Sequence, residues 1–440
     1  MSQQINALEK AYRRRWLIWI VACLAHTIGM FHRASLTPMA DRIMADFNIS
    51  AFAFGGLGAA YFYIYAAMQL PSGTLADTLG PRKTITTGLL LSGVGSLIMG
   101  FAPTFGVLYL GRVIISFGVS IVWLNVIKLV MEWFPSRQVA TTIGLSSSIM
   151  LLGQIVATTP LALLIMAAGW RASLATSAVV TFALAASNWL IVRNSPAQMG
   201  LPPLSELEGL TAVRVAPLEQ PPDLSLGRRF KIILGNKYLW PLMMVGLGTY
   251  GAYATLFYNW TVVYLMQSYD LPRASAANFV LVVTIGIMIG SPTIGFLSDK
   301  VLHRRRLPII VFAGVVLACC LTWALWNGGR PPLGVLYLLS FLIGFGNGAV
   351  FLNFACVKDI IPSYVQGIAL GLLNMGAFIG PAIAQPLFGY ILDRGWKGEI
   401  VEGVRVYPLA AFQQGFFLCC GLALLGFISA LLVKETYARR

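Results

Sequence analysis

Seven ionisable side chains lie inside long apolar stretches of the chain: His26, Arg33, Arg112, Lys128, Glu132, Lys358 and Asp359. An ionisable group at the centre of a membrane helix costs roughly 2.5–3.5 kcal/mol on insertion scales, so each needs a reason. Arg33 offers a rigid fork of donors that matches a carboxylate or phosphate. We expect Arg33 to anchor an anionic ligand. The alternatives are a gating ion pair with Asp41 or Asp46, or snorkelling to the membrane surface.

Lys128 and Glu132 are one helical turn apart in the same apolar stretch. This spacing allows a structural ion pair, although the more favourable order puts the glutamate first. In the alternative interpretation, Lys128 is a second cation that helps to balance a dianion. The sequence leaves both open.

Two histidines are candidates for proton coupling, because histidine titrates near physiological pH. His26 lies seven residues before Arg33, and hence on roughly the same helix face. His32 adjoins Arg33 and therefore points elsewhere. The alternative for both is a packing residue held by hydrogen bonds.

Tyrosine and amide side chains could complete a pocket by hydrogen-bonding hydroxyl or carboxylate groups. Their alternative role is contact between helices, worth about 0.6–2 kcal/mol each. The candidate substrate-binding residues are Tyr61, Tyr65, Asn125, Gln154, Tyr253, Asn259, Asn353 and Asn374, and further polar residues of the same kind are Tyr250, Tyr258 and Gln385. Asn125 and Asn353 are the strongest of these, because they occupy matching positions in two similar halves.

The amino-acid composition indicates that these side chains lie within a membrane protein. Of the 440 residues, 58% are apolar and 11% charged, against about 45–50% and 25% in soluble domains. The mean hydropathy is +0.76. These values indicate an all-α polytopic membrane protein, because a barrel would alternate polar and apolar residues.

Twelve segments are long and apolar enough to be membrane helices. They are residues 16–37, 52–76, 84–103, 106–133, 139–167, 172–192, 238–267, 275–298, 307–327, 332–361, 365–393 and 408–433. Basic residues gather in alternate connections, such as 13–15, 82–83 and 304–306, while the intervening connections hold few. By the positive-inside rule, both termini face the cytoplasm.

The segments form two similar halves. Residues 193–237 hold six prolines and mixed charges without a sustained apolar run, which predicts a cytoplasmic linker between a bundle over 1–192 and another over 238–440. The sequence VWLN at 122–125 matches VFLN at 350–353, and GTLAD at 73–77 matches GFLSD at 295–299. Two duplicated six-helix bundles suit alternating access around a midplane site.

Residues 69–83 read QLPSGTLADTLGPRK, which resembles the loop 2–3 signature of the major facilitator superfamily, G-x-L-x-D-x-x-G-x-R-K. Gly111 and Arg112 resemble its second motif, and the run from Gly144 through Gly153 to Pro160 resembles its glycine-rich fifth span. The resemblance covers essentially the whole chain. It implies a twelve-helix transporter with conformational rather than ligand roles for the motif residues.

Within that superfamily, HRASL at 32–36 followed by DFNIS at 46–50 resembles the anion:cation symporter branch, which carries sugar acids and other organic anions. That branch often reads D-R-A here, and its arginine grips the substrate carboxylate. In this chain His32 replaces the acid, and Val119 stands near the place of a coupling glutamate in the fourth span. The resemblance therefore implies an anion grip at Arg33 but not the branch's coupling chemistry.

The remaining charged residues of the matching motifs are expected to control the conformational change that opens and closes the transporter. Glu132 and Asp359 each lie just before the proline that marks the inner end of their span. We expect them to pair with Arg82 and with Arg304 or its neighbours and so to latch the inner gate, and the alternative is simple solvation of the helix ends. The predicted gating residues are Asp77, Arg82, Arg112, Glu132, Asp299, Arg304 and Asp359. We expect substitutions of Asp77, Arg82 and Arg112 to impair transport without abolishing binding.

These observations predict a secondary transporter for a small organic anion, working by proton symport or anion exchange in the inner or plasma membrane. We expect a monomer in the lipid bilayer with no cofactor, metal or nucleic acid. The six cysteines form no CxxC pair, and there is no P-loop. The rival hypotheses are an amino-acid or peptide transporter, a multidrug-type efflux carrier, and a non-transporting sensor on the same scaffold.

Overall fold

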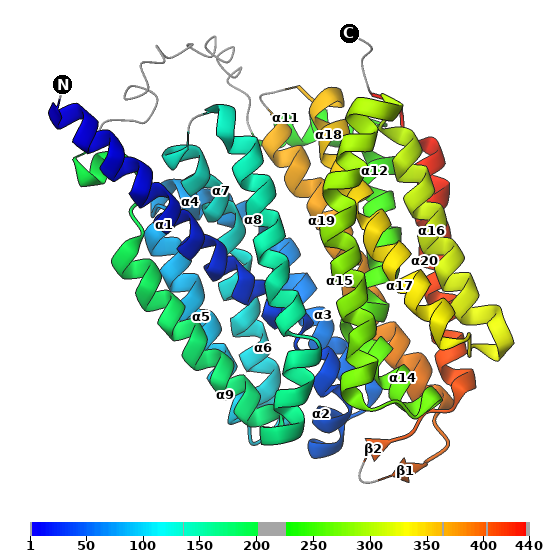
Figure 1. Ribbon diagram of the computed structural model, residues 1–440. Coiled ribbons are helices and arrows are strands. Elements are labelled where there is room, and N and C mark those ends of the chain that lie inside the picture. The colour runs from blue at the N-terminus through cyan, green and yellow to red at the C-terminus, as the bar shows by residue number, and fades with distance from the viewer. Residues whose placement is uncertain (1, 135, 201–225, 363–364, 402–403, 437–440) are drawn as a thin grey trace. The chain divides into compact units, whose positions relative to one another are not determined.

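The computed structural model describes residues 2–134, 136–200, 226–362, 365–401 and 404–436. The elements up to residue 200 are α1 (Ser2–Ala34), η1 (Thr37–Met39), α2 (Ala40–Asp46), α3 (Ala51–Ala67), α4 (Gln69–Thr78), α5 (Pro81–Gly100), α6 (Phe105–Ser120), α7 (Val122–Trp133), α8 (Ser136–Val156), α9 (Thr159–Ile191) and η2 (Pro196–Met199). Figure 1 shows them from blue to green.

The later elements are α11 (Leu226–Leu234), α12 (Leu239–Val245), η3 (Gly246–Tyr250), α13 (Gly251–Thr255), η4 (Leu256–Trp260), α14 (Thr261–Tyr269), α15 (Arg273–Phe296), η5 (Leu297–Leu302), α16 (Arg306–Leu325), η6 (Trp326–Gly328), α17 (Leu333–Gly346), η7 (Asn347–Ala349), α18 (Val350–Ile360), α19 (Gln366–Gly395), β1 (Ile400–Val401), β2 (Val404–Arg405) and α20 (Leu409–Leu432). The short antiparallel pair β1–β2 is the one sheet among the described residues, and the sequence did not predict it.

Every predicted span is helical, as expected for an all-α membrane protein. Among the described residues, eight segments are long and apolar enough to cross a membrane. One of them, Thr142–Ile191, breaks at Gly169 with a φ of 82° and contains two predicted spans. The helices of the other three predicted spans are shorter, less apolar or interrupted.

The predicted span 238–267 is interrupted by two π-helical segments. The chain runs from α12 through η3, α13 and η4 into α14 without leaving the helical region. Departures of this kind occur frequently at functional sites. The two segments end in Tyr250 and Trp260, and η4 also holds Tyr258 and Asn259.

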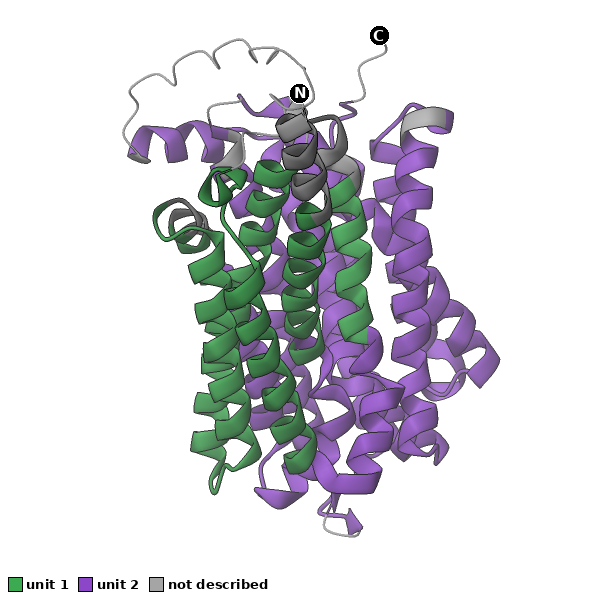
Figure 2. Cartoon of the chain, turned by 60° about the vertical axis from the view of Figure 1, so that its left-hand side comes forward, with its two compact units in different colours: residues 1–32, 67–154, 171–222 green, residues 33–66, 155–170, 223–440 purple. Residues whose placement is uncertain are grey.

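The chain divides into two compact units, coloured in Figure 2. Unit 1 comprises residues 1–32, 67–154 and 171–222, and unit 2 comprises 33–66, 155–170 and 223–440. The units therefore differ from the predicted halves, since residues 33–66 pack with the later part of the chain. The division at the linker stays a prediction.

Within unit 2, helices α3 and α19 touch through their backbones. A Cβ added at Gly389 would lie 2.1 Å from the carbonyl oxygen of Ala51, and one added at Gly55 would lie 2.4 Å from that of Gln385. Only glycine allows such an approach. This contact fixes the face of α3 that carries Tyr61 and Tyr65.

Candidate functional site

Arg33 lies in the last turn of α1 and is 9% exposed. Its Nε donates to the Tyr61 hydroxyl and its Nη1 to the Tyr250 hydroxyl, both at 3.3 Å. The guanidinium carbon lies 5.3 Å from the ring centres of Tyr61 and Tyr65 and 5.5 Å from that of Phe378. We call these five residues the Arg33 cage; all belong to unit 2.

The cage is assembled from three parts of unit 2. Tyr61 and Tyr65 are one turn apart on α3, and their rings stack at 5.6 Å. Tyr250 ends the π-helical segment η3. Phe378 on α19 lies 4.5 Å from the ring of Tyr65 and 5.9 Å from that of Tyr250. Aromatic faces attract a guanidinium while leaving its net charge uncompensated.

The carboxylates expected as alternative partners of Arg33 are engaged elsewhere in unit 2. Asp41 forms a bidentate ion pair with Arg273, which also donates to the carbonyl oxygen of Pro38. Asp46 accepts a hydrogen bond of 2.9 Å from the indole of Trp170. The structure therefore does not show the gating pair of Arg33 with Asp41 or Asp46.

A third carboxylate of unit 2, Asp393, caps a helix, which the sequence did not predict. Asp393 accepts from the backbone N–H groups of Ala51 at 2.9 Å and Phe52 at 2.7 Å, at the N-terminus of α3. Arg405 lies 3.5 Å from the same carboxylate. Burial, with a smaller contribution from Asp393, raises the pKa of Tyr407. Asp393 and Asp41 together tie residues 33–66 to later helices.

Lys128 and Glu132 lie in unit 1, on a hollow of about 310 Å³. Its lining residues are Thr78, Leu79, Gly80, Pro81, Lys128, Glu132, Asn194 and Ser195. Lys128 is half-buried and Glu132 is exposed. This placement beside the loop between α4 and α5 favours the structural interpretation of Lys128 over the second substrate cation.

Arg112 is 2% exposed in α6, and its Nη1 donates to the carbonyl oxygen of His32 at 2.6 Å. His32 is fully buried, with its ring 5.5 Å from that of Phe31. His26 is 4% exposed and its ring lies 4.9 Å from that of Trp123. These contacts fit packing roles, and the proton role of either histidine remains a prediction.

The remaining substrate-binding candidates are divided between the two units. Those in unit 1 are Asn125 and Gln154, both fully buried, and the Asn125 amide donates to the carbonyl oxygen of Ile121 in its own helix. Those in unit 2 are Tyr253, Asn259, Asn353 and Asn374. The Tyr253 hydroxyl lies 3.3 Å from that of Tyr258. Sequence reasoning missed Phe378, because an apolar ring carries no signal of binding.

Arg82 has other partners than the Glu132 that we expected. Its Nε and Nη2 donate to the carbonyl oxygen of Trp189 at 2.9 and 2.6 Å, and the guanidinium lies 4.3 Å from that residue's ring. Arg304 is exposed. The predicted gating residues Asp77, Asp299 and Asp359 have side chains outside the described part of the structure.

Two asparagines that the sequence did not single out hold the first turn of α5. Asn194 accepts from the backbone N–H of Arg82 at 2.8 Å. Asn188, which is fully buried, donates to the Arg82 carbonyl at 3.1 Å and to the Thr86 hydroxyl at 2.8 Å. The signature loop of unit 1 is therefore fastened to the end of α9.

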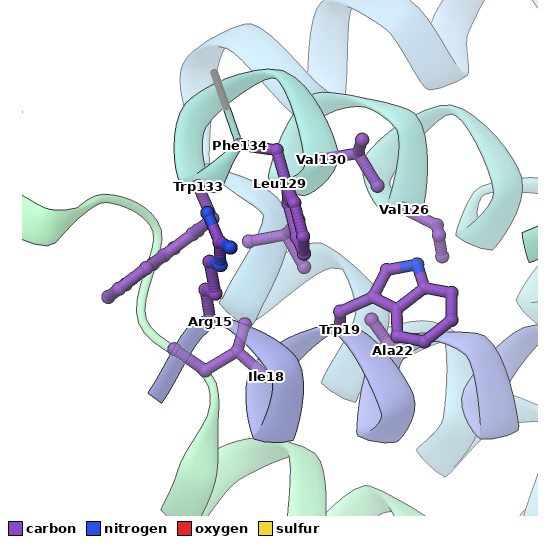
Figure 3. A pocket seen from close by; sticks show the side chains of 9 residues that line it. All are labelled: Arg15, Ile18, Trp19, Ala22, Val126, Leu129, Val130, Trp133 and Phe134. Carbon is purple, nitrogen blue, oxygen red and sulfur yellow. The ribbon is translucent and has the colours of Figure 1, made fainter. Parts of the chain in front are cut away.

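A small hollow between α1 and α7 contains another buried arginine, Arg15 (Figure 3). Arg15 is 4% exposed, and its guanidinium lies 5.4 Å from the ring of Trp16 and 5.1 Å from that of Phe134. The other lining residues are mostly apolar, among them Trp19 and Trp133. The hollow is a packing feature of unit 1, filled by these side chains.

The described residues contain no group of three or more histidine, cysteine or acidic side chains that could hold a metal ion. All six cysteines are buried and unpaired with one another.

Comparisons with known proteins show what the chain is similar to. The family model of the Major Facilitator Superfamily matches residues 22–365. A probable sulfoacetate transporter, SauU, of Cupriavidus necator is 23% identical over 98% of this chain and 97% of its own length. A probable galactarate/D-glucarate transporter, GarP, of Escherichia coli K12 is 22% identical over 88% and 90%.

The fold is also similar to a solved structure. A bacterial homologue of the human lysosomal transporter Spinster, in an inward-facing and unoccupied conformation, superposes with a TM-score of 0.68. The match covers 96% of both chains at 16% identity.

Proposed function

The chain belongs to the major facilitator superfamily, and from that premise we propose that it moves a small organic anion across the membrane by alternating access, with Arg33 holding the anionic group. It is a secondary transporter and not an enzyme. The proposal places it in the inner or plasma membrane as a monomer, with both termini cytoplasmic and the two predicted bundles rocking about the site.

The observation that carries the proposal is the Arg33 cage. A buried cation without a carboxylate partner is costly unless an anion completes it. Arg33 contacts hydroxyl groups and aromatic rings. A guanidinium has five N–H donors, and Tyr61, Tyr65 and Tyr250 take one each, so the guanidinium retains donors for a carboxylate.

The cage also argues against the rival substrates. An amino acid or peptide carries an ammonium group, and an exported drug is commonly a cation; both need an acid in the pocket. By sequence, the predicted spans hold acids only near their ends, at Glu132, Asp359 and Asp393. A sensor on the same scaffold would bind the anion but would not carry it.

We favour exchange of one anion for another over proton symport. The empty cage leaves the Arg33 charge uncompensated, which should hinder return of the empty site through the membrane. A carboxylate near Arg33 would neutralise the guanidinium and so remove that hindrance, but Asp41 is paired with Arg273. A histidine-coupled symport remains the second mechanism, with His26 or His32 as proton carrier.

The test measures the melting temperature of the purified protein against anionic, zwitterionic, neutral and cationic compounds, with Arg33→Gln alongside. A ligand at 100 times its Kd should stabilise the native state by about 2.7 kcal/mol. Carboxylates should stabilise the wild type and not the variant. An unchanged response of Arg33→Gln, or stabilisation by cations alone, would sink the proposal. Flux of the ligand into proteoliposomes then separates a transporter from a sensor.

A further inference from the structure

Two lysines of unit 2 meet at one tyrosine ring. The Nζ atom of Lys237 lies 5.3 Å from the centre of the Tyr238 ring, and the Nζ atom of Lys434 lies 4.6 Å from the same centre. The first lysine precedes α12 and the second follows α20, so two segments far apart in the sequence bring these charges together. We call the two lysines the Tyr238 lysine pair; all three residues belong to unit 2.

The two ammonium groups carry like charges, and both side chains are exposed. Within the described part of the structure, neither lysine forms an ion pair with a carboxylate. The acid beside Lys434, Glu435, accepts hydrogen bonds from the backbone N–H groups of Arg305 and Arg306 at 3.0 and 3.2 Å. An aromatic ring attracts a cation but leaves its charge uncompensated. The pair therefore offers a position where an anion can bind two cations at once.

The sequence places the Tyr238 lysine pair at the membrane surface. The first lysine directly precedes the predicted span 238–267, and the second directly follows the predicted span 408–433. Trp240 is 43% exposed and Leu432 66%, and the Trp240 indole donates to the carbonyl oxygen of Leu234 at 2.9 Å. Tryptophan and lysine at the ends of membrane helices are typical of the headgroup region. The anion within reach of the pair is therefore expected to be a lipid phosphate.

Other basic residues lie at the same end of unit 2. Arg228 and Lys231 are exposed on α11, which ends shortly before α12 and contains no acid. Arg306 donates to the carbonyl oxygen of Leu431 in the last turn of α20. Clusters of basic residues beside a membrane helix attract anionic lipids. The surroundings of the pair therefore favour an anionic lipid over a neutral one.

From this arrangement we propose that the Tyr238 lysine pair binds the phosphate of an anionic phospholipid, such as phosphatidylglycerol. The inference goes beyond the proposed function and does not depend on Arg33. The phosphate lies between the two ammonium groups, and the acyl chains lie against exposed apolar side chains such as Trp240 and Leu432. A zwitterionic phospholipid binds less tightly, because its own ammonium group is repelled by the two lysines.

A phosphate at this position also stabilises the contact between two helices. A Cβ added at Gly248 of η3 would lie 2.4 Å from the carbonyl oxygen of Leu422 in α20, so the two segments touch through their backbones. The two lysines repel each other where these helices reach the membrane surface. A bound phosphate removes this repulsion. We therefore expect an anionic lipid to raise the melting temperature of the protein.

The experiment titrates the full-length protein in detergent with dioleoyl phosphatidylglycerol and, separately, with dioleoyl phosphatidylcholine. Bound lipid is counted by native mass spectrometry, and binding of inorganic phosphate is measured by isothermal titration calorimetry. The test variant combines Lys237→Gln with Lys434→Gln. The matched control combines Arg228→Gln with Lys231→Gln, which removes the same charge from the same end of unit 2 but leaves the pair intact.

We expect phosphatidylglycerol to bind the wild type at least tenfold more tightly than phosphatidylcholine, a difference of about 1.4 kcal/mol. The test variant should lose at least tenfold of its affinity for phosphatidylglycerol, and the control variant should keep most of it. Equal binding of the two lipids overturns the proposal. An equal loss in the test and control variants also overturns it, because the attraction would then be general. Inorganic phosphate that binds as tightly as phosphatidylglycerol would replace the lipid as the ligand.

A charge-conserving variant and a melting curve complete the test. Lys237→Arg with Lys434→Arg keeps both charges and should keep the affinity for phosphatidylglycerol. This lipid should raise the melting temperature of the wild type and not that of the test variant; an equal rise in both contradicts the proposal. If the test variant fails to fold, seen in its melting curve without lipid, Lys434→Gln alone and the wild-type ratio of the two lipids decide.

Discussion

Arg33 and Arg273 are both buried arginines of unit 2, but they are satisfied in different ways. Arg273 has the carboxylate of Asp41 and the carbonyl oxygen of Pro38. Arg33 has two hydroxyls and three aromatic rings. The first arginine is complete within the protein, so it serves the structure. The second is supported but not neutralised, which is what a site for an external anion requires.

The largest expected effect comes from removing the carboxylate that neutralises Arg273, so that this arginine, like Arg33, has no counter-charge. Asp41→Asn leaves a buried guanidinium without its counter-charge, and breaking a buried pair typically costs about 3–5 kcal/mol. We expect a strong fall in the melting temperature. The double variant Asp41→Leu, Arg273→Met should recover much of this loss, because it removes both charges. A single variant as stable as the wild type would mean that the pair is not structural.

Arg33→Gln tests whether Arg33, unlike Arg273, binds the ligand rather than stabilising the structure. We expect at least a 100-fold loss of anion affinity, about 2.7 kcal/mol, with little change in the unliganded melting temperature. Arg33→Lys keeps the charge but loses the planar set of guanidinium donors, so the anion affinity should fall about tenfold. Arg112→Gln, the matched control in unit 1, should lower stability and keep the ligand response. If the two glutamine variants behaved alike, Arg33 would be structural too.

The contact between α3 and α19 positions the cage, and Gly389→Ala tests it. The new methyl group would lie 2.1 Å from the Ala51 carbonyl oxygen, which forces the helices apart at a typical cost of about 1–3 kcal/mol. Flux should fall more than anion affinity. Gly56→Ala is the control, because a Cβ there meets nothing within 4 Å. Equal effects of the two changes would show that the contact does not matter.

The smallest expected effect belongs to the cage hydroxyls. Tyr61→Phe and Tyr250→Phe each remove one acceptor of Arg33, and a hydrogen bond to a charged group contributes about 1.5–3 kcal/mol at most. We expect a three- to tenfold loss of anion affinity by titration calorimetry. Tyr390→Phe, at an exposed position of α19, should leave affinity unchanged. If neither cage variant lost anion affinity, the two hydroxyls would not contribute to the binding site.

Much of the architecture could be predicted from the sequence. Long apolar runs identify membrane helices because the bilayer requires about 20 such residues, and each predicted span is helical. The interruptions were not predictable: neither the π-helical segments of residues 246–250 and 256–260 nor the pair β1–β2 carries a strong local signal. The compact units, which differ from the predicted halves, likewise depend on tertiary packing.

The site was predictable only in part. Arg33 was identifiable because a charge inside an apolar stretch is expensive, and Tyr61 and Tyr65 because polar groups there need partners. Phe378 carries no such signal. The partners of Asp41 and Asp393 lie 232 and 342 residues away along the chain, a separation at which spacing gives no information. The roles of His26, His32 and the amide candidates remain predictions.

The two π-helical segments would allow the helix of residues 239–269 to change its register, which a regular α-helix cannot do. Each segment holds its backbone in an i→i+5 pattern. A return of η4 to α-helical pairing would advance everything beyond it by one position, about 100° around the axis and 1.5 Å along it. Tyr258 and Asn259 lie within η4 while Tyr250 precedes it. Such a shift in register would turn Tyr258 and Asn259 relative to Tyr250 within one continuous helix.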